Sequence, residues 1–135
     1  MRIRCEKSSL SPDQIANLPG QDAATAALWR SKFAVDVGRE YSPLGMYSDL
    51  GSLWVYVVDS FNRLRVAPLG LFAIVDGSIP VSWKVSQERA TSVVFVAPPD
   101  ASKLSFADRV DEQEPTALNS FNRMLAELGY RRDGV

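Results

Sequence analysis

Residues 53–66, with the sequence LWVYVVDSFNRLRV, are the most informative stretch for the fold. Residues 53–58 are rich in β-branched and aromatic side chains, residues 59–63 are mostly polar residues that favour a turn, and the apolar pattern resumes at residues 64–66. Two such runs joined by a short polar segment are typical of a β-hairpin. We therefore predict an antiparallel pair of strands here.

Both faces of the first strand of this hairpin are apolar. Because side chains alternate between the two faces of a strand, a pattern that is apolar on both faces leaves two interpretations. Either the strand is covered on both sides, which we favour, or one face is open to a partner. The first face carries Leu53, Val55 and Val57, and the second carries Trp54, Tyr56 and Val58.

Other short strands are expected on both sides of the hairpin. Alternating or β-rich patterns predict strands in residues 1–6, 33–37, 71–75, 81–85 and 92–97. Residues 41–47 contain Pro43 and Gly45, which suit an edge strand or a bulged, strongly bent strand. Short strands that recur about every ten residues favour a meander or a small barrel.

Helices are expected near both ends of the chain. Ser11, followed by Pro12 and by Gln14 three residues after the cap, predicts a short helix that ends near residue 18. Residues 22–29 fit either a second short helix or an irregular loop, and residues 98–114 are expected to cross the surface. Residues 115–128 predict an amphipathic helix with Gly129 as its C-cap, with Leu118, Phe121, Leu125 and Leu128 along one face.

Length and composition fit one folded unit. The chain has 135 residues, of which 46% are hydrophobic and 23% charged, values that are typical of a globular protein. We expect a single domain over residues 1–135 of the α+β class. Its core would be a small antiparallel β-barrel or strongly bent sheet, with a short N-terminal helix and a C-terminal amphipathic helix.

The charge balance limits the classes of partner that we expect, and the N-terminal sequence indicates the cellular compartment. The formal net charge is -1, so no chain-wide positive field favours nucleic acid or an anionic membrane. The apolar stretch 69–75 is far shorter than the roughly 20 residues that span a bilayer. The charged N-terminus lacks the pattern of a secretory signal, and the single Cys5 fits a reducing compartment, so we expect a cytoplasmic protein.

Familiar catalytic patterns are missing from the sequence. The chain has no histidine, which removes the commonest general base and the commonest metal ligand. Cys5 lies at an apolar position of the first strand and is expected to be a buried thiol. A carboxylate pair of Glu40 with Asp49 or Asp59 could do acid and base chemistry, but turn carboxylates are the favoured interpretation. We therefore expect no enzyme, no cofactor and no metal.

Four segments of the chain resemble a group of small bacterial proteins that includes immunity proteins of contact-dependent or polymorphic toxin systems. The resemblance lies in residues 38–41, 54–59, 68–76 and 82–83, which are strand and turn residues without a catalytic signature. It implies an SH3-like or other small β-barrel core with added helices. It also implies a protein that binds and masks a cognate toxin, and it transfers no contact residues.

These observations lead to one main hypothesis and two alternatives. The main hypothesis is a binding module of the immunity type that neutralises a cognate protein toxin by direct binding. The alternatives are a small-ligand-binding or enzymatic barrel that uses carboxylates, and a regulator of another host protein. Aromatic residues are enriched at interface hot spots and acidic ones can complement a basic toxin cleft, so the candidate partner-binding residues are Tyr47, Asp49, Trp54, Tyr56, Asp59 and Asp76.

Overall fold

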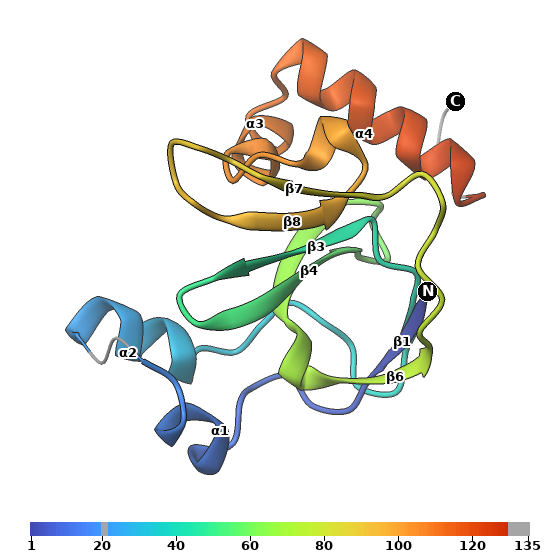
Figure 1. The fold of residues 1–135 in the computed structure, drawn as a ribbon. Coiled ribbons are helices and arrows are strands. Elements are labelled where there is room, and N and C mark those ends of the chain that lie inside the picture. Colours follow the sequence, from blue (N-terminus) through green and yellow to red (C-terminus); the bar gives the residue numbers. More distant parts are fainter. Residues whose placement is uncertain (20–21, 130–135) are drawn as a thin grey trace.

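Antiparallel strands in two sheets, with helices at both ends, form the fold shown in Figure 1. The computed structural model describes residues 1–19 and 22–129. The three-stranded sheet has the order β2 (Glu40–Tyr41), β1 (Arg2–Cys5) and β6 (Phe72–Asp76). The five-stranded sheet has the order β5 (Leu64–Pro68), β4 (Ser52–Val58), β3 (Gly45–Asp49), β8 (Val94–Ala97) and β7 (Lys84–Gln87).

The helices lie in two groups on either side of the sheets. The short helices α1 (Pro12–Ala16) and α2 (Ala23–Arg30) lie at the lower left of Figure 1, and α3 (Phe106–Asp111) and α4 (Pro115–Glu127) lie at the top. Two 3-10 turns, η1 (Leu69–Leu71) and η2 (Pro99–Ala101), complete the elements. The α+β class is therefore confirmed, and no described helix is long and apolar enough to cross a membrane.

The predicted hairpin is confirmed as β4 and β5, which pair in antiparallel register from Val58 opposite Leu64 to Trp54 opposite Pro68. The chain then passes through η1 into β6, which pairs with β1 in the other sheet. Because β5 leads into the three-stranded sheet and does not pair with β7, the described strands form two sheets and no closed barrel is found among them.

One face of the five-stranded sheet forms an aromatic core, which we call the aromatic face: Tyr47, Trp54, Tyr56 and Phe95. Trp29 of α2 stacks on Trp54 with 5.4 Å between ring centroids, and Phe106 of α3 meets Tyr56 edge-on at 5.9 Å. All four sheet residues are less than a tenth exposed. Helices α2 and α3 therefore cover this face.

A close approach between β3 and β8 completes the aromatic face. A Cβ atom at Gly45 would lie 2.5 Å from the Cβ of Ala97, far inside van der Waals contact. Glycine at this position lets β3 and β8 pack closely beside the ring of Tyr56, the residue of β4 that pairs with Gly45.

The predicted helix ends are largely confirmed. Ser11 and Gln14 form a reciprocal capping box, in which the Ser11 N–H donates to Gln14 Oε1 at 2.9 Å and the Gln14 N–H donates to Ser11 Oγ at 3.3 Å. The stretch 22–29 forms a helix, with Asp22 accepting from the Thr25 N–H at 2.9 Å. The C-terminal helix is confirmed as α4, with Gly129 just beyond it in the left-handed region.

The strand predicted at residues 33–37 is wrong. Phe33 and Val35 are buried as the alternation predicts, but the Phe33 N–H donates to the Ser8 carbonyl and the Val35 N–H donates to the Phe33 carbonyl. The Asp36 N–H donates to the Tyr41 hydroxyl at 2.9 Å. These bonds hold the segment as an irregular connection, and the short strand β2 begins only after it, at Glu40.

Three further segments differ from the prediction. Strand β3 is a central strand that pairs with β4 and β8, because Pro43 precedes it and Gly45 permits the close packing described above. Strand β7 begins at Lys84, a few residues later than expected. Residues 98–114, predicted to cross the surface, contain η2 and the helix α3, whose Phe106 and Val110 point into the core one helical turn apart.

Candidate functional site

Three of the predicted partner-binding residues, Tyr47, Trp54 and Tyr56, belong to the aromatic face. Burial raises the pKa of both tyrosine hydroxyls, since a tyrosinate would have to form away from water. The Tyr56 hydroxyl donates to the Lys103 carbonyl at 3.4 Å, and Trp54 Nε1 donates to the Asp49 carbonyl at 3.0 Å. The structure thus places the three rings in the core and not on a surface that a partner could contact.

Asp59 organises the turn between β4 and β5. Its carboxylate accepts hydrogen bonds from the backbone N–H groups of Phe61 and Arg63, at 2.8 and 2.9 Å, and from the side-chain Nε of Arg63 and Arg65, at 3.2 and 3.0 Å. Burial alone would raise the pKa of Asp59, but the hydrogen bonds from Arg63, Arg65 and Phe61 outweigh it and lower the pKa. The structure gives this carboxylate a turn-forming role.

The other two predicted carboxylates lie at strand ends in different sheets. Asp49 ends β3 in the five-stranded sheet, while Asp76 ends β6 in the three-stranded sheet. Asp76 accepts from the Ser78 N–H at 2.9 Å, and the backbone and side-chain hydrogen bonds from Ser78 lower its pKa. The six predicted residues therefore do not form one site.

Cys5 is a buried thiol that is 1% exposed. Burial raises the pKa of the thiol, and Sγ donates to the Lys7 carbonyl at 3.3 Å. A nucleophile needs the opposite shift, because the thiolate is the reactive form. Among the described residues, no group of three or more His, Cys, Asp or Glu side chains could hold a metal ion.

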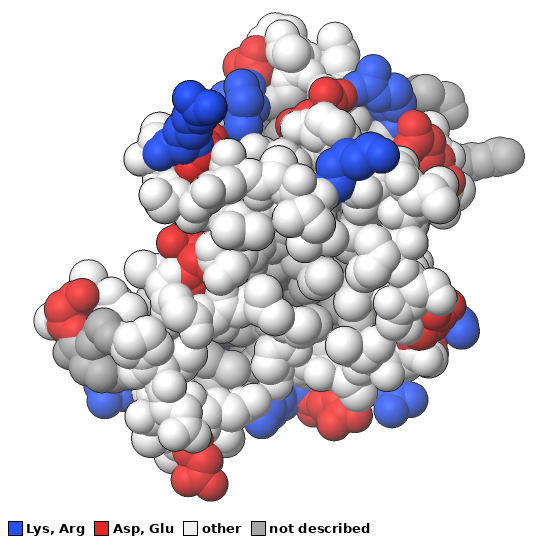
Figure 2. Space-filling model, viewed as in Figure 1, with Lys and Arg blue, Asp and Glu red and all other residues white. Residues whose placement is uncertain are grey.

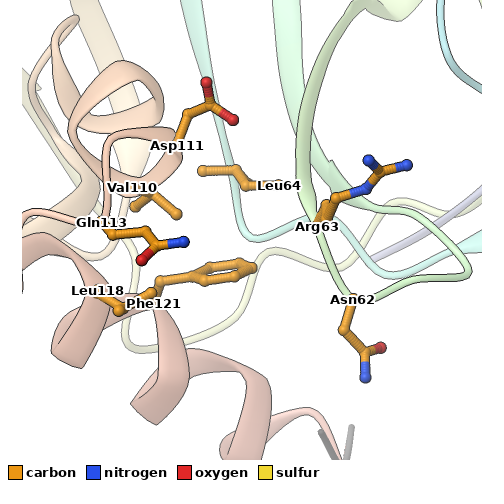
Figure 3. Close-up of a pocket in the computed structure, with 8 residues that line it drawn as sticks. All are labelled: Asn62, Arg63, Leu64, Val110, Asp111, Gln113, Leu118 and Phe121. Carbon is orange, nitrogen blue, oxygen red and sulfur yellow. The ribbon is translucent and has the colours of Figure 1, made fainter. Parts of the chain in front are cut away.

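A small pocket opens between the β4–β5 turn and the α3–α4 corner, as Figure 3 shows. Its volume is about 260 Å³, which is slightly below the usual range for small-molecule sites. Leu64, Val110, Leu118 and Phe121 supply apolar walls, and Asn62, Arg63, Asp111 and Gln113 supply the polar groups.

The polar groups of this pocket come from two elements. Asn62 and Arg63 lie on the turn, and Gln113 directs its amide from the opposite side toward the space between them (Figure 3). The guanidinium of Arg63 already bonds Asp59 and lies 5.1 Å from the ring centroid of Phe61. The pocket can receive one side chain or a small ligand, and it holds no nucleophile.

The second candidate site is the face of the five-stranded sheet opposite the aromatic face. The register places Val85 beside Val96, Val96 beside Met46, and Met46 beside Val55, in one row across four strands. The next row on this face joins Gln87, Val94, Ser48 and Leu53.

Only part of this second face is covered. Val55 is fully buried at the β4 end, where η1 packs against the strand, whereas Leu53 is 48%, Val85 76% and Val94 39% exposed. The uncovered residues contain no acidic or basic side chain. We call this surface the open face: Met46, Ser48, Leu53, Val85, Gln87, Val94 and Val96.

The charge pattern of the surface agrees with this description. Figure 2 shows a broad area without Lys, Arg, Asp or Glu across the middle of the molecule, where Figure 1 places β3, β4 and β8 in the same view. Charged side chains surround this area above and below. The favoured interpretation, a strand covered on both sides, is confirmed for β4 from Trp54 to Val58, which are all buried, whereas Leu53 near the start of the strand is 48% exposed.

No protein-family model matches the chain, and no curated protein and no solved structure matches it.

Proposed function

We propose that this chain is a protein-binding module and that its open face is the surface that meets the partner. One observation carries the proposal: three large apolar residues, Leu53, Val85 and Val94, are between 39% and 76% exposed on one face of one sheet, without a charged residue among them. Contiguous apolar surface of this kind marks interaction sites in proteins.

An exposed apolar sheet face suits a protein partner better than a small ligand. Ligand sites are concave and enclose most of their ligand, whereas protein interfaces are broad and place an apolar centre within a polar rim. A standard interface covers about 800 Å² on each partner. The uncharged area in Figure 2, surrounded by charged side chains, has this arrangement. The partner surface that fits it is apolar at its centre.

Within this proposal, the partner is a cognate protein toxin and the chain acts in the cytoplasm as its immunity protein. The toxin assignment rests on the resemblance to immunity-type proteins in residues 54–59 and 68–76. In this proposal the two antiparallel sheets, joined through η1, correspond to the SH3-like core that the resemblance implies. Inhibition by masking an active site requires no catalytic group in the inhibitor.

Coexpression with the product of the gene immediately upstream tests the proposal. We expect the two proteins to purify as a complex and the chain to rescue growth of cells in which that product is toxic. Leu53→Glu should strongly weaken both effects, because it places a charge within an apolar interface. Ile74→Glu is the matched control, since Ile74 is 55% exposed on β6, outside the open face.

Two outcomes would contradict the proposal. The first is the absence of both complex and rescue in cells where the upstream product is active. The second is a complex that Leu53→Glu and Ile74→Glu weaken to the same extent, because the contact surface would then lie elsewhere.

A small-ligand function is the second candidate, and the pocket of about 260 Å³ in Figure 3 is the observation that favours it. Its apolar walls and its polar groups from Asn62, Asp111 and Gln113 suit a group about the size of one side chain. This alternative would be favoured if coexpression gave neither a complex nor rescue of growth and a small molecule bound at this pocket.

A further inference from the structure

Strand β7 is an edge of the five-stranded sheet, and its register shows which backbone groups point outward. The Glu88 N–H donates to the Val93 carbonyl at 3.0 Å, so this pair is hydrogen-bonded. In an antiparallel ladder, hydrogen-bonded and non-hydrogen-bonded pairs alternate along the strand. Lys84 and Ser86 therefore bond to β8, while Val85 and Gln87 direct their N–H and carbonyl groups away from it.

These outward backbone groups lack a partner in residues 1–19 and 22–129, where no backbone hydrogen bond outside the ladder involves Val85 or Gln87. The edge is also continuous with the open face, since Val85 is 76% exposed and belongs to both. The opposite edge of the same sheet differs, because α3 packs against β5. An uncovered edge beside an apolar face is the arrangement to which an extended segment adds as a further strand.

The charges along this edge favour an acidic segment. Lys84 and Arg89, at the two ends of the β7 segment, are exposed and form no ion pair with any residue the structure describes. The acidic residue between them, Glu88, is already engaged, because its Oε1 accepts from the Thr91 hydroxyl at 2.8 Å and from the Leu104 N–H at 3.4 Å. The edge therefore presents two unpaired cations.

We propose that β7 binds an extended acidic segment of the partner protein, which pairs antiparallel to it as a sixth strand. This inference rests on the proposed function, and it names the element of the partner that the chain recognises. Residues opposite Val85 and Gln87 extend the open face and are apolar. The residue opposite Lys84 is Asp or Glu, and a second acid lies near Arg89.

A peptide with this pattern is the direct probe. Acetyl-Glu-Thr-Val-Thr-Val-Glu-amide should shift the backbone amide resonances of Val85 and Gln87 saturably and slow their hydrogen exchange by about tenfold or more when bound. The same peptide with Lys in place of both Glu should bind roughly twofold to tenfold more weakly, because two exposed charge pairs become repulsive.

Two changes remove the backbone pairing itself. Gln87→Pro deletes an N–H that the β7–β8 ladder does not use, so it should abolish peptide binding in a folded protein, whereas Gln87→Ala should bind as the wild type does. Gln87→Ala also controls for the side-chain bond from Gln87 Nε2 to the Ser92 carbonyl. A peptide N-methylated at its valines gives the same test without changing the protein and should not bind.

Several results would overturn the inference. These are unshifted Val85 and Gln87 amides at millimolar peptide, equal binding of the Lys peptide, or unchanged binding by Gln87→Pro. If the protein forms concentration-dependent dimers in which the Val85 and Gln87 amides are protected from hydrogen exchange, the edge binds a second copy of the chain instead. If Gln87→Pro keeps the complex that Leu53→Glu loses in coexpression, the edge inference fails while the proposed function stands.

Discussion

The two faces of the five-stranded sheet are built from similar residues but have different surroundings. On the aromatic face, Trp54 is 5% and Tyr56 1% exposed beneath α2 and α3. On the open face, the neighbouring Leu53 is 48% and Val85 76% exposed. An antiparallel sheet commonly buries one face and presents polar residues on the other, so an uncovered apolar face needs its own explanation.

This contrast shows that the elements packed against each face, and not the strand sequence, separate core from surface here. Strand β4 contributes apolar side chains to both faces, and it is buried from Trp54 to Val58, while Leu53 near its start is 48% exposed. We interpret the aromatic face as the source of stability and the open face as the source of binding. Each prediction below tests this division.

The largest contrast is expected from neighbouring residues in β4. Trp54→Ala removes the stacking with Trp29 and leaves a cavity, so it should lower the free energy of unfolding by about 3–5 kcal/mol. Leu53→Ala, one position earlier on the open face, should cost about 1 kcal/mol or less. Urea unfolding followed by circular dichroism measures both, and similar losses would contradict the division into two faces.

Gly45→Ala should destabilise the aromatic face by about 1–3 kcal/mol, because the new methyl group would overlap the Cβ of Ala97. Ala97→Gly removes the atom that it meets, so the double variant should recover much of the loss. A double-mutant cycle by chemical unfolding checks the coupling. If the changes in unfolding free energy of Gly45→Ala and Ala97→Gly were strictly additive, the close approach of Gly45 and Ala97 would not limit the packing.

Asp59→Asn should lower the free energy of unfolding by about 1–3 kcal/mol at pH 7, because it weakens the hydrogen bonds that close the β4–β5 turn. Because the pKa of Asp59 is lowered in the folded protein, its contribution is present above the unfolded value of about 3.9 and is lost as the pH falls through the folded pKa. The difference between wild type and variant should therefore shrink below about pH 4, as urea unfolding at several pH values would show. A difference that does not change with pH would contradict this.

The smallest effect on stability is expected at the open face. Leu53→Lys with Val94→Lys should change the free energy of unfolding by about 0.5 kcal/mol at most per substitution, since both positions are partly exposed and the charges can reach water. Thermal unfolding checks this. A loss of several kcal/mol would show that the face is covered and would remove the basis for the binding proposal.

Local patterns predicted the elements whose determinants are short-range. The capping box at Ser11, the β4–β5 turn and the buried positions Phe121 and Leu125 of α4 each depend on residues close together in sequence, whereas Leu128, predicted on the same face, lies beyond the helix and is 41% exposed. The strand predicted at residues 33–37 is absent because the buried Phe33 and Val35 have no strand partner there, and bonds from Phe33 to the distant Ser8 and from Asp36 to the nearby Tyr41 decide the conformation. Helix α3 was missed because its apolar positions Phe106 and Val110 stand among polar residues.

The candidate site was harder to predict for a related reason. Exposure depends on which helix packs on which face, and the pattern of β4 is apolar on both. The residue types of an interface occur on the aromatic face, but Tyr47, Trp54 and Tyr56 lie under α2 and α3. The exposed Val85 lies near the start of β7, whereas the sequence predicted a strand that ends at this residue. The free edge of β7 follows from strand order, which no local pattern specifies.

The most direct test of the central claim is the affinity of the upstream gene product for the Leu53→Glu, Val94→Glu double variant, measured by isothermal titration calorimetry beside wild type and Ile74→Glu. We predict that the double variant, while still folded, binds at least about thirtyfold more weakly, as expected when interface hot spots worth about 2 kcal/mol are lost. Ile74→Glu should bind as the wild type does. Equal affinity of all three proteins would contradict the claim that the open face is the binding surface.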